Sequence, residues 1–223
     1  MRKNLGAKPY CYPQPVFILA AYGKDGTPNA MNAAWGGISN DRELSMCISA
    51  EHKTTKNILA RKAFTVSMAD AAHAAACDYV GLVSGDKVPD KFARAGFHAV
   101  KSEFVDAPLI EELPIAVECR LKSFDPETCR MVGEIVNVSV DERVLDKEGR
   151  VDVKKAAPIT KLNTSIITAA EQQTMNYYMN IAAFYKSDRG RKLYQEIGMI
   201  EEQHVTQYGA LLDTKCTWLE SLL

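Results

Sequence analysis

Two neighbouring runs, Ile115–Lys122 (IAVECRLK) and Met131–Val140 (MVGEIVNVSV), carry the clearest strand pattern in the chain. In the first run apolar residues occupy every second position, which is the period of a strand with one buried and one exposed face. Asp125-Pro126-Glu127 between the runs is rich in turn-forming residues. We therefore predict an antiparallel pair with Ile115, Val117, Cys119 and Leu121 facing inward and Ala116, Glu118, Arg120 and Lys122 facing outward.

The strand pattern extends toward the N-terminus. Val16–Tyr22 is a continuous apolar run typical of a buried strand, and the Asp25-Gly26 pair that follows it favours a hairpin turn. Ala63–Met68 predicts another strand. Many strands with few helices between them favour an antiparallel barrel over a doubly wound sheet. The short helices expected between the strands are near Lys53–Arg61, Ala71–Leu82 and Lys91–Ala95.

Composition limits the class of protein. The 223 residues suffice for one large domain, or one domain and a small addition. A net charge of -1 gives no electrostatic reason to expect nucleic acid or an anionic membrane as a partner. No apolar run approaches the ~20 residues of a membrane span, and the first residues lack the apolar core of a signal peptide. The six cysteines form no Cys-x-x-Cys pair. We expect a cytoplasmic protein without a disulfide framework or zinc site.

The segment Ser49–Ile58, SAEHKTTKNI, lies between a predicted strand and a predicted helix. The first amides of a helix have no acceptor within it, and the helix dipole places partial positive charge there. Hydroxyl groups and Lys53 or Lys56 would add donors and a full charge. The segment therefore fits a phosphate monoester. The alternative is a capped surface helix with solvated lysines.

The segment Asn29–Gly37, NAMNAAWGG, is unusual for a strand because it combines small residues, two amides, a Trp and paired glycines. Small side chains allow a flat ligand to lie against the backbone, and amide groups can serve the edge of a heteroaromatic ring. The alternative is a Gly-rich edge strand whose Trp plugs the barrel.

Residues 1 to about 159 resemble the flavoredoxin and flavin reductase-like family, which has an FMN-binding split β-barrel. The resemblance rests on an ordered set of motifs that covers about two-thirds of the chain: GTPNAMNAAWGGISND, SAEHKTTKNI, CDYVGLVSGDKVPDKF, GFHAVKSEFVDAPLIEELP and VGEIVNV. It implies non-covalent FMN at a homodimer interface. It also implies an oxidoreductase that passes electrons from NAD(P)H or a redox partner, through FMN, to an acceptor. A non-enzymatic electron carrier is the alternative.

The resemblance also implies which residues of this chain surround the flavin. No catalytic acid or base is expected among them, because the cofactor carries the chemistry. The phosphate and ribityl group would meet Ser49, His52, Lys53, Thr54, Thr55 and Asn57; the isoalloxazine would meet Asn29, Asn32, Ala33, Ala34 and Trp35; and Ser84, Gly85 and Lys91 would belong to a loop near the flavin.

The period becomes helical after Ser165, so we predict a barrel domain over residues 1–160 and a helical hairpin over 165–223, joined by a linker at Lys154–Thr164. The hairpin resembles part of a ferritin-like di-iron protein. Glu171 on one helix, with Glu201 and His204 on one face of the next, would form half of an iron site, which a homodimer would complete. The alternatives are ordinary surface acids, or a chain whose main role is metal binding.

Overall fold

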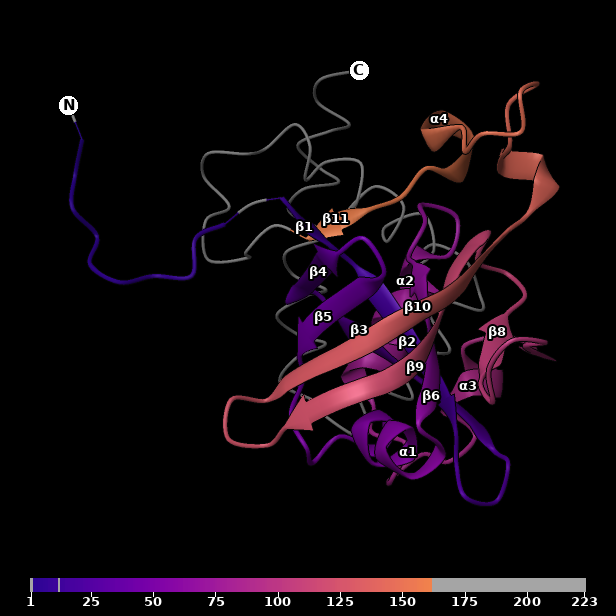
Figure 1. Ribbon diagram of the computed structural model, residues 1–223, viewed down its shortest axis with the longest axis horizontal. Coiled ribbons are helices and arrows are strands. Elements are labelled where there is room, and N and C mark those ends of the chain that lie inside the picture. The colour runs from indigo at the N-terminus through magenta and orange to yellow at the C-terminus, as the bar shows by residue number, and fades with distance from the viewer. Residues whose placement is uncertain (1, 12, 162–223) are drawn as a thin grey trace, which may run out of the picture.

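The computed structural model describes residues 2–11 and 13–161, in which strands predominate (Figure 1). One antiparallel sheet has seven strands in the order β3-β2-β6-β9-β10-β5-β4. These strands are β2 (Phe17–Tyr22), β3 (Pro28–Ala33), β4 (Gly36–Asn40), β5 (Glu43–Cys47), β6 (Ala63–Met68), β9 (Ile115–Asp125) and β10 (Arg130–Val140). Two small sheets pair β1 (Gln14–Pro15) with β11 (Thr160–Lys161), and β7 (Ala99–Lys101) with β8 (Pro108–Ile110). The helices are α1 (Lys53–Arg61), α2 (Ala74–Leu82), α3 (Lys91–Arg94), η1 (Glu142–Val144) and α4 (Val153–Ala156).

The predicted hairpin is confirmed as β9 and β10, which pair antiparallel from Asp125 opposite Arg130 to Ile115 opposite Val140. The turn between them is held by the Asp125 carboxylate. It accepts hydrogen bonds from the Glu127 amide at 2.9 Å and from the Thr128 hydroxyl at 2.6 Å. The Asx turn thus fixes the register at one end of the pair.

The alternation along β9 fails at two residues that were predicted to face solvent, Ala116 and Glu118, because both are buried. Glu118 is the charged one. Its carboxylate accepts hydrogen bonds from the Ser102 and Ser139 hydroxyls and, at 2.7 Å, from the Asn137 amide. Ser102 in turn accepts the amides of Phe104 and Val105, each at 3.0 Å. The 102–105 loop therefore covers a face of the sheet that the local period alone would leave open.

The sheet curls into the predicted barrel, and β2 lies between two cores. Phe17, Leu19 and Ala21 belong to the cluster inside the barrel, whereas Ile18 and Ala20 pack with the cluster that includes α2 and α3. Burial on both faces explains why the β2 sequence is continuously apolar instead of alternating.

The two ends of the sheet approach each other. A Cβ built on Gly36 of β4 would lie 3.1 Å from the ring of Phe17 on β2. The two edge strands β3 and β4 are joined by only Ala34 and Trp35 and are not neighbours in the hydrogen-bonded order. The result is the predicted split barrel, and the structure places its open edge strands at β3 and β4.

The helix predictions are confirmed for α1 and are close for the other two. The helix predicted from Ala71 begins instead at Ala74. Asp70 accepts the His73 amide at 2.8 Å and also contacts the His73 ring, so residues 71–73 form a turn that leads into α2.

The predicted linker at Lys154–Thr164 is wrong over its described part. Asp152 accepts the amides of Lys154 and Lys155 and so begins α4. The Ile159 amide donates to the Ala69 carbonyl at 2.9 Å, and β11 pairs with β1. Backbone pairing with distant strands, which Pro158 and polar composition do not reveal, attaches this segment to the barrel. The helical domain predicted at 165–223 lies outside the described residues.

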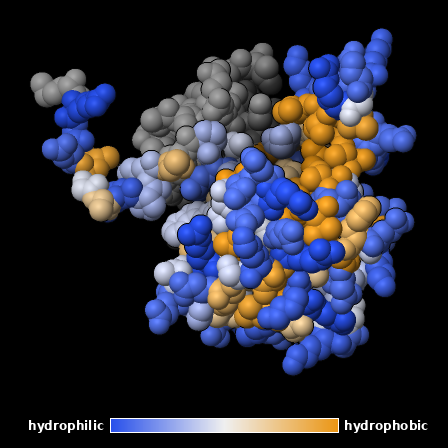
Figure 2. Space-filling model, in the orientation of Figure 1, coloured by the Kyte–Doolittle hydropathy of each residue, from blue (hydrophilic) through white to orange (hydrophobic). Residues whose placement is uncertain are grey.

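The face of the molecule seen in Figure 2 is mainly hydrophilic, with apolar residues gathered where the end of β10 meets the α4 segment. Val138, Val151 and Val153 are exposed large apolar side chains of these segments. None of the helices in the described part of the chain has the length and apolar character needed to cross a bilayer.

Candidate functional site

A cavity of about 290 Å³ lies where the N-terminus of α1 meets the C-terminal end of α2. Its size is close to the lower limit for small-molecule sites. It is lined by Met31, Asn32, His52, Lys53, Thr54, Val80, Gly81, Leu82, Val83, Ser84, Gly85 and Lys91. Seven of these were predicted to lie at or near the flavin: Asn32, His52, Lys53, Thr54, Ser84, Gly85 and Lys91.

The N-terminus of α1 supplies the positive end of the cavity. His52 is the N-cap residue, but its side chain makes no capping hydrogen bond, and the first turn contains no acidic residue. The first amides of a helix have no intrahelical acceptor, and Lys53 stands half-buried at the first position. The local sequence therefore leaves donors and a positive charge facing the same space, which suits an anion.

Buried polar atoms next to this helix lack partners. The Asn29 amide nitrogen donates to the Thr54 hydroxyl at 2.6 Å. Within residues 2–11 and 13–161, however, Asn29 Oδ1, Thr55 Oγ1 and Asn57 Nδ2 have no hydrogen-bond partner. A buried polar atom without a partner is costly in a folded protein. Three such atoms gathered on β3 and α1 indicate groups that a ligand or ordered water can satisfy.

Two glycines allow the end of α2 to approach β3. A Cβ on Gly85 would lie 2.2 Å from Asn29 Oδ1 and 3.1 Å from Lys53 Cγ. A Cβ on Gly81 would lie 2.8 Å from the Cβ of Asn32. Both approaches are too close for any other residue without movement, so these glycines set the width of the cavity.

Lys91 supplies a second positive charge, in an unusual setting. The side chain is buried, and its ammonium donates to the carbonyls of Val80 at 2.9 Å and Val83 at 2.8 Å. Burial lowers the pKa of Lys91 to about 8, against a weaker opposite effect of Asp86. Because an ammonium has three N–H donors, Lys91 ties down the end of α2 and retains one donor for the cavity that it lines.

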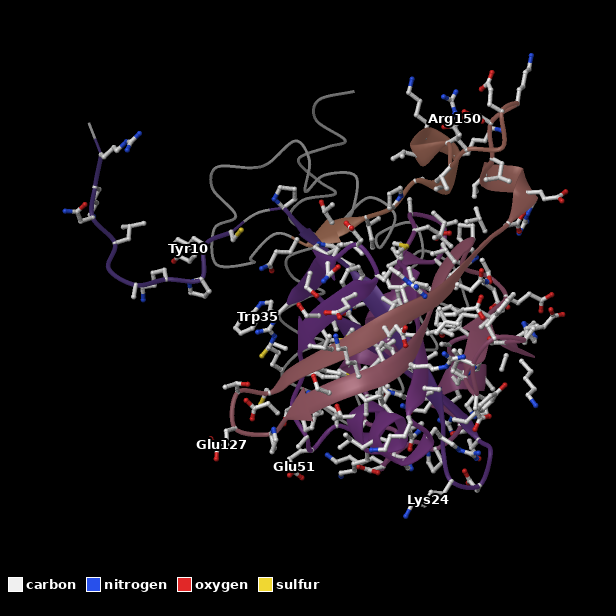
Figure 3. All side chains as sticks on the ribbon, in the orientation of Figure 1. Tyr10, Lys24, Trp35, Glu51, Glu127 and Arg150 are labelled. Atoms are coloured by element: carbon white, nitrogen blue, oxygen red, sulfur yellow. The ribbon has the colours of Figure 1, made fainter. Side chains whose placement is uncertain are left out.

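The remaining predicted residues lie beside the cavity or away from it. Ser49 is half-buried, and its hydroxyl accepts the Glu51 amide at 3.3 Å in the turn before α1. Ala33 packs inside the barrel, and Ala34 is buried. Trp35 is 54% exposed and projects outward from the barrel, on the same side as Glu127 of the β9–β10 turn (Figure 3). The alternative in which Trp35 plugs the barrel is therefore wrong.

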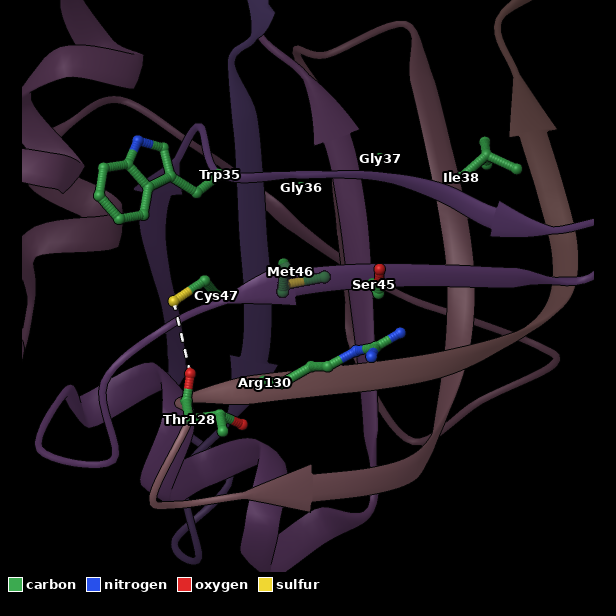
Figure 4. A pocket seen from close by; sticks show the side chains of 9 residues that line it. All are labelled: Trp35, Gly36, Gly37, Ile38, Ser45, Met46, Cys47, Thr128 and Arg130. Atoms are coloured by element: carbon green, nitrogen blue, oxygen red, sulfur yellow. Dashed lines mark hydrogen bonds between the residues drawn. The ribbon is translucent and has the colours of Figure 1, made fainter. Parts of the chain in front are cut away.

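A second, open hollow of about 400 Å³ lies beside Trp35, on the outer surface of β4, β5 and the start of β10 (Figure 4). Its lining residues are Trp35, Gly36, Gly37, Ile38, Ser45, Met46, Cys47, Thr128 and Arg130. Trp35 was predicted to meet the isoalloxazine, so this hollow belongs to the same candidate flavin site.

The sequence analysis missed the apolar wall made by Met31, Val80, Gly81, Leu82 and Val83. Val80 belongs to the hydrophobic cluster under α2, and an apolar stretch of this kind is typical of a hydrophobic core. Gly81, a helix-weakening residue inside α2, was the one local indication that another segment approaches closely.

The predicted iron ligands Glu171, Glu201 and His204 lie outside the described residues. Within the described part of the chain, the metal-ligating atoms of His98, Glu111 and Glu112 lie within 4.8 Å of one another. None of these three residues lines the cavity.

Comparisons with known proteins identify the family and the fold of this chain. The family described as "Flavin reductase like domain" matches residues 10–156. Flavoredoxin of Desulfovibrio vulgaris (Miyazaki F) is 37% identical, with a TM-score of 0.70 over 74% of this chain and 90% of that one. Flavoredoxin from Methanosarcina acetivorans is 26% identical, with a TM-score of 0.65 over 74% of this chain and 89% of that one.

A protein of Aquifex aeolicus (strain VF5), described as uncharacterized, is 28% identical over 162 residues, which are 67% of this chain and 81% of that protein. The family match spans most of the described barrel, including both helices that border the cavity. The chain belongs to the flavin reductase-like family.

Proposed function

We propose that this protein is an FMN-dependent oxidoreductase that passes electrons from NAD(P)H or a redox partner to an acceptor. The observation that carries the proposal is the cavity at the N-terminus of α1. There an uncapped helix end and Lys53 occur together, and buried polar atoms of the adjoining β3 and α1 have no partner among the described residues. Family membership and similarity to two flavoredoxins support a flavin as the ligand.

The residues present fit a flavin mononucleotide. The phosphate would accept the first amides of α1 and the ammonium of Lys53. The Asn29 carbonyl oxygen, which has no partner in the described part of the chain, can accept a hydrogen bond from a hydroxyl or ring N–H of the ligand. The apolar wall of Val80 and Leu82 suits the flat ring.

Bound FMN would supply the electron-accepting ring, and the chain's own residues bind, orient and enclose it. Gly81 and Gly85 keep the wall close enough for contact. Lys91 anchors that wall through two carbonyls and places a positive charge at its edge. A fixed positive charge favours electron-rich ligand states, so Lys91 would raise the tendency of the ligand to accept electrons.

The similarity to flavoredoxins also favours a second candidate, an electron carrier that exchanges electrons only with a protein partner. Direct oxidation of NADH or NADPH by the purified protein separates the two. Catalytic turnover supports the oxidoreductase. A flavin that is reduced only by a redox protein supports the carrier.

We further propose a homodimer and a cytoplasmic location. The motif resemblance, in which the flavin lies at a dimer interface, supports the dimer. Light scattering of the purified protein measures its mass; a mass of one chain of 24.6 kDa at all concentrations would contradict the dimer.

Loss of the phosphate site tests the proposed function. The double variant Lys53→Ala/Thr54→Ala removes the charge and a hydroxyl at the helix end, and we expect FMN affinity to fall about tenfold or more. FMN fluorescence quenching measures it. Lys147→Ala, an exposed lysine with no part in the cavity, is the matched control.

Unchanged FMN affinity in the double variant would refute the phosphate assignment. Because Thr54 is buried, thermal unfolding of the variant shows whether its fold is retained. Lys53→Ala alone, at a half-buried position, gives a second measurement that leaves the core intact.

A further inference from the structure

A cluster of metal-ligating side chains lies at one end of the small sheet β7–β8. His98 immediately precedes β7, and Glu111 and Glu112 immediately follow β8. Ala99 pairs with Ile110, and the Glu111 amide donates to the His98 carbonyl at 3.0 Å, so the antiparallel ladder extends by one residue pair. His98 and Glu111 therefore lie opposite each other, with their side chains on the same side of the ladder. β8 lies on the opposite side of the barrel from β4 and β5 (Figure 1).

Glu112 adds a second carboxylate next to the His98 ring. Glu112 Oε2 accepts a hydrogen bond from the His98 amide at 3.0 Å, and Glu112 Oε1 lies 2.5 Å from His98 Nδ1. The Glu112 side chain is only 19% exposed, so its surroundings as well as the amide contact fix the carboxylate. The fold itself thus brings an imidazole and a carboxylate together.

Glu111 completes a set of three ligating groups. The ligating atoms of His98, Glu111 and Glu112 all lie within 4.8 Å of one another. The donor atoms around a tetrahedral ion with bonds of about 2.1 Å stand about 3.4 Å apart. Both His98 and Glu111 are exposed, so rotation of these side chains can bring the three atoms to that spacing.

Charge and donor type favour a particular class of cation. Neither Glu111 nor Glu112 forms an ion pair with a lysine or arginine in the part of the chain that the structure describes. Two negative charges therefore stand beside one imidazole. One nitrogen with two carboxylate oxygens is a donor set that zinc and other first-row divalent ions accept, whereas Mg²⁺ and Ca²⁺ prefer oxygen alone.

We propose that His98, Glu111 and Glu112 bind a divalent transition-metal ion of the zinc type at the end of the β7–β8 pair. The ion would take the place of the proton between His98 and Glu112 and would coordinate Glu111 as well, with water completing its shell. It would tie the start of β7 to the end of β8, and so hold the hairpin whose 102–105 loop covers Glu118. The site is independent of the proposed flavin function, because its residues line neither hollow.

The His98 ring is its own reporter, because a bound metal lowers the reactivity of an imidazole toward diethyl pyrocarbonate. The experiment follows modification of His98 and of His52 by peptide mass spectrometry, in the full-length protein, with Zn²⁺ or Mg²⁺ added. His52 is exposed and lies at α1, outside the cluster. We expect Zn²⁺ to slow the modification of His98 about fivefold or more and to leave that of His52 unchanged, and we expect Mg²⁺ to protect neither.

Two glutamate variants test the ligand set. Glu111→Gln keeps the size of the side chain and removes its charge, so the Zn²⁺ concentration that gives half protection should rise about tenfold or more. Glu103→Gln, at an exposed position in the loop at the other end of the hairpin, is the matched control and should change nothing. Both substituted positions are exposed, so neither variant disturbs the core.

Three results would overturn the site. Absence of Zn²⁺ protection at His98 would show that the cluster holds no such ion. Equal protection by Mg²⁺ would show attraction by charge alone. Protection that is unchanged in Glu111→Gln, or is weakened as much in Glu103→Gln, would show that Glu111 is not a ligand.

Discussion

The two hollows of this barrel both contain glycines and a basic side chain, but they differ in how closely these residues are packed. The cavity at α1 is lined by a buried ammonium and two close-packed glycines, and buried polar atoms of the adjoining β3 and α1 lack partners in the described part of the chain. The hollow on β4 and β5 is open, and its Arg130 and Gly37 touch little. The lining of the cavity at α1 packs against other segments of the fold, whereas the lining of the hollow on β4 and β5 is largely exposed. A change of the same kind should therefore have very different consequences in the two places.

The largest difference in unfolding free energy is expected between alanine substitutions at two glycines, one in each hollow. Gly85→Ala places a Cβ 2.2 Å from the Asn29 side chain, so we expect a loss of about 3 kcal/mol in unfolding free energy and weaker FMN binding. Gly37→Ala meets no atom within 4 Å and should change the unfolding free energy by about 0.5 kcal/mol or less. Chemical denaturation measures both. Equal effects of the two substitutions would show that the cavity at α1 is not closely packed.

A smaller effect is expected from Lys91, on the pH dependence of the unfolding free energy. Its pKa in the folded protein is about 8, below the usual 10.4 of the unfolded chain. Between these values the unfolded state binds more protons, so the unfolding free energy should rise with pH. We expect a rise on the order of 2 kcal/mol from pH 7 to 10.5 relative to Lys91→Met.

Denaturation of both proteins across that pH range isolates the contribution of Lys91, because other groups titrate equally in the two. Tyr22, for example, has a pKa raised by burial in both proteins. A difference that stays constant with pH would mean that the Lys91 ammonium is not buried as the structure shows.

The smallest effect is expected at Arg130. Because this guanidinium is exposed and forms no ion pair with any described residue, Arg130→Gln should change the unfolding free energy by about 0.5 kcal/mol or less. Chemical denaturation of Arg130→Gln and Lys91→Met under the same conditions compares their unfolding free energies directly. A loss comparable to that of Lys91→Met would mean that Arg130 stabilises the fold.

Local sequence patterns were sufficient to predict several of the strands and one helix. The period of β9 and β10 predicted the antiparallel pair, and the bounds of β6 and α1 match the structure. The exceptions depend on residues distant in sequence. Glu118 is buried because the 102–105 loop covers it, and the linker prediction failed because β11 pairs with β1.

In the candidate site, too, some features follow from the local sequence and others depend on residues distant in sequence. The segment that we propose to bind the phosphate was predicted from a local feature, a run of donors before a helix, and the structure places an uncapped helix end there. The direction of Trp35 and the partners of Lys91 were not, because the first depends on the curl of the sheet and the second on the end of α2. The apolar wall at Val80 and Leu82 looked like ordinary core until the fold placed it opposite Lys53.

The most direct test of the central claim, that the cavity at α1 holds FMN, is the visible absorption spectrum of the purified protein, with the released cofactor identified after denaturation. Flavin bands and release of about one FMN per chain are the predicted result. A colourless protein that also fails to take up added FMN would contradict the claim.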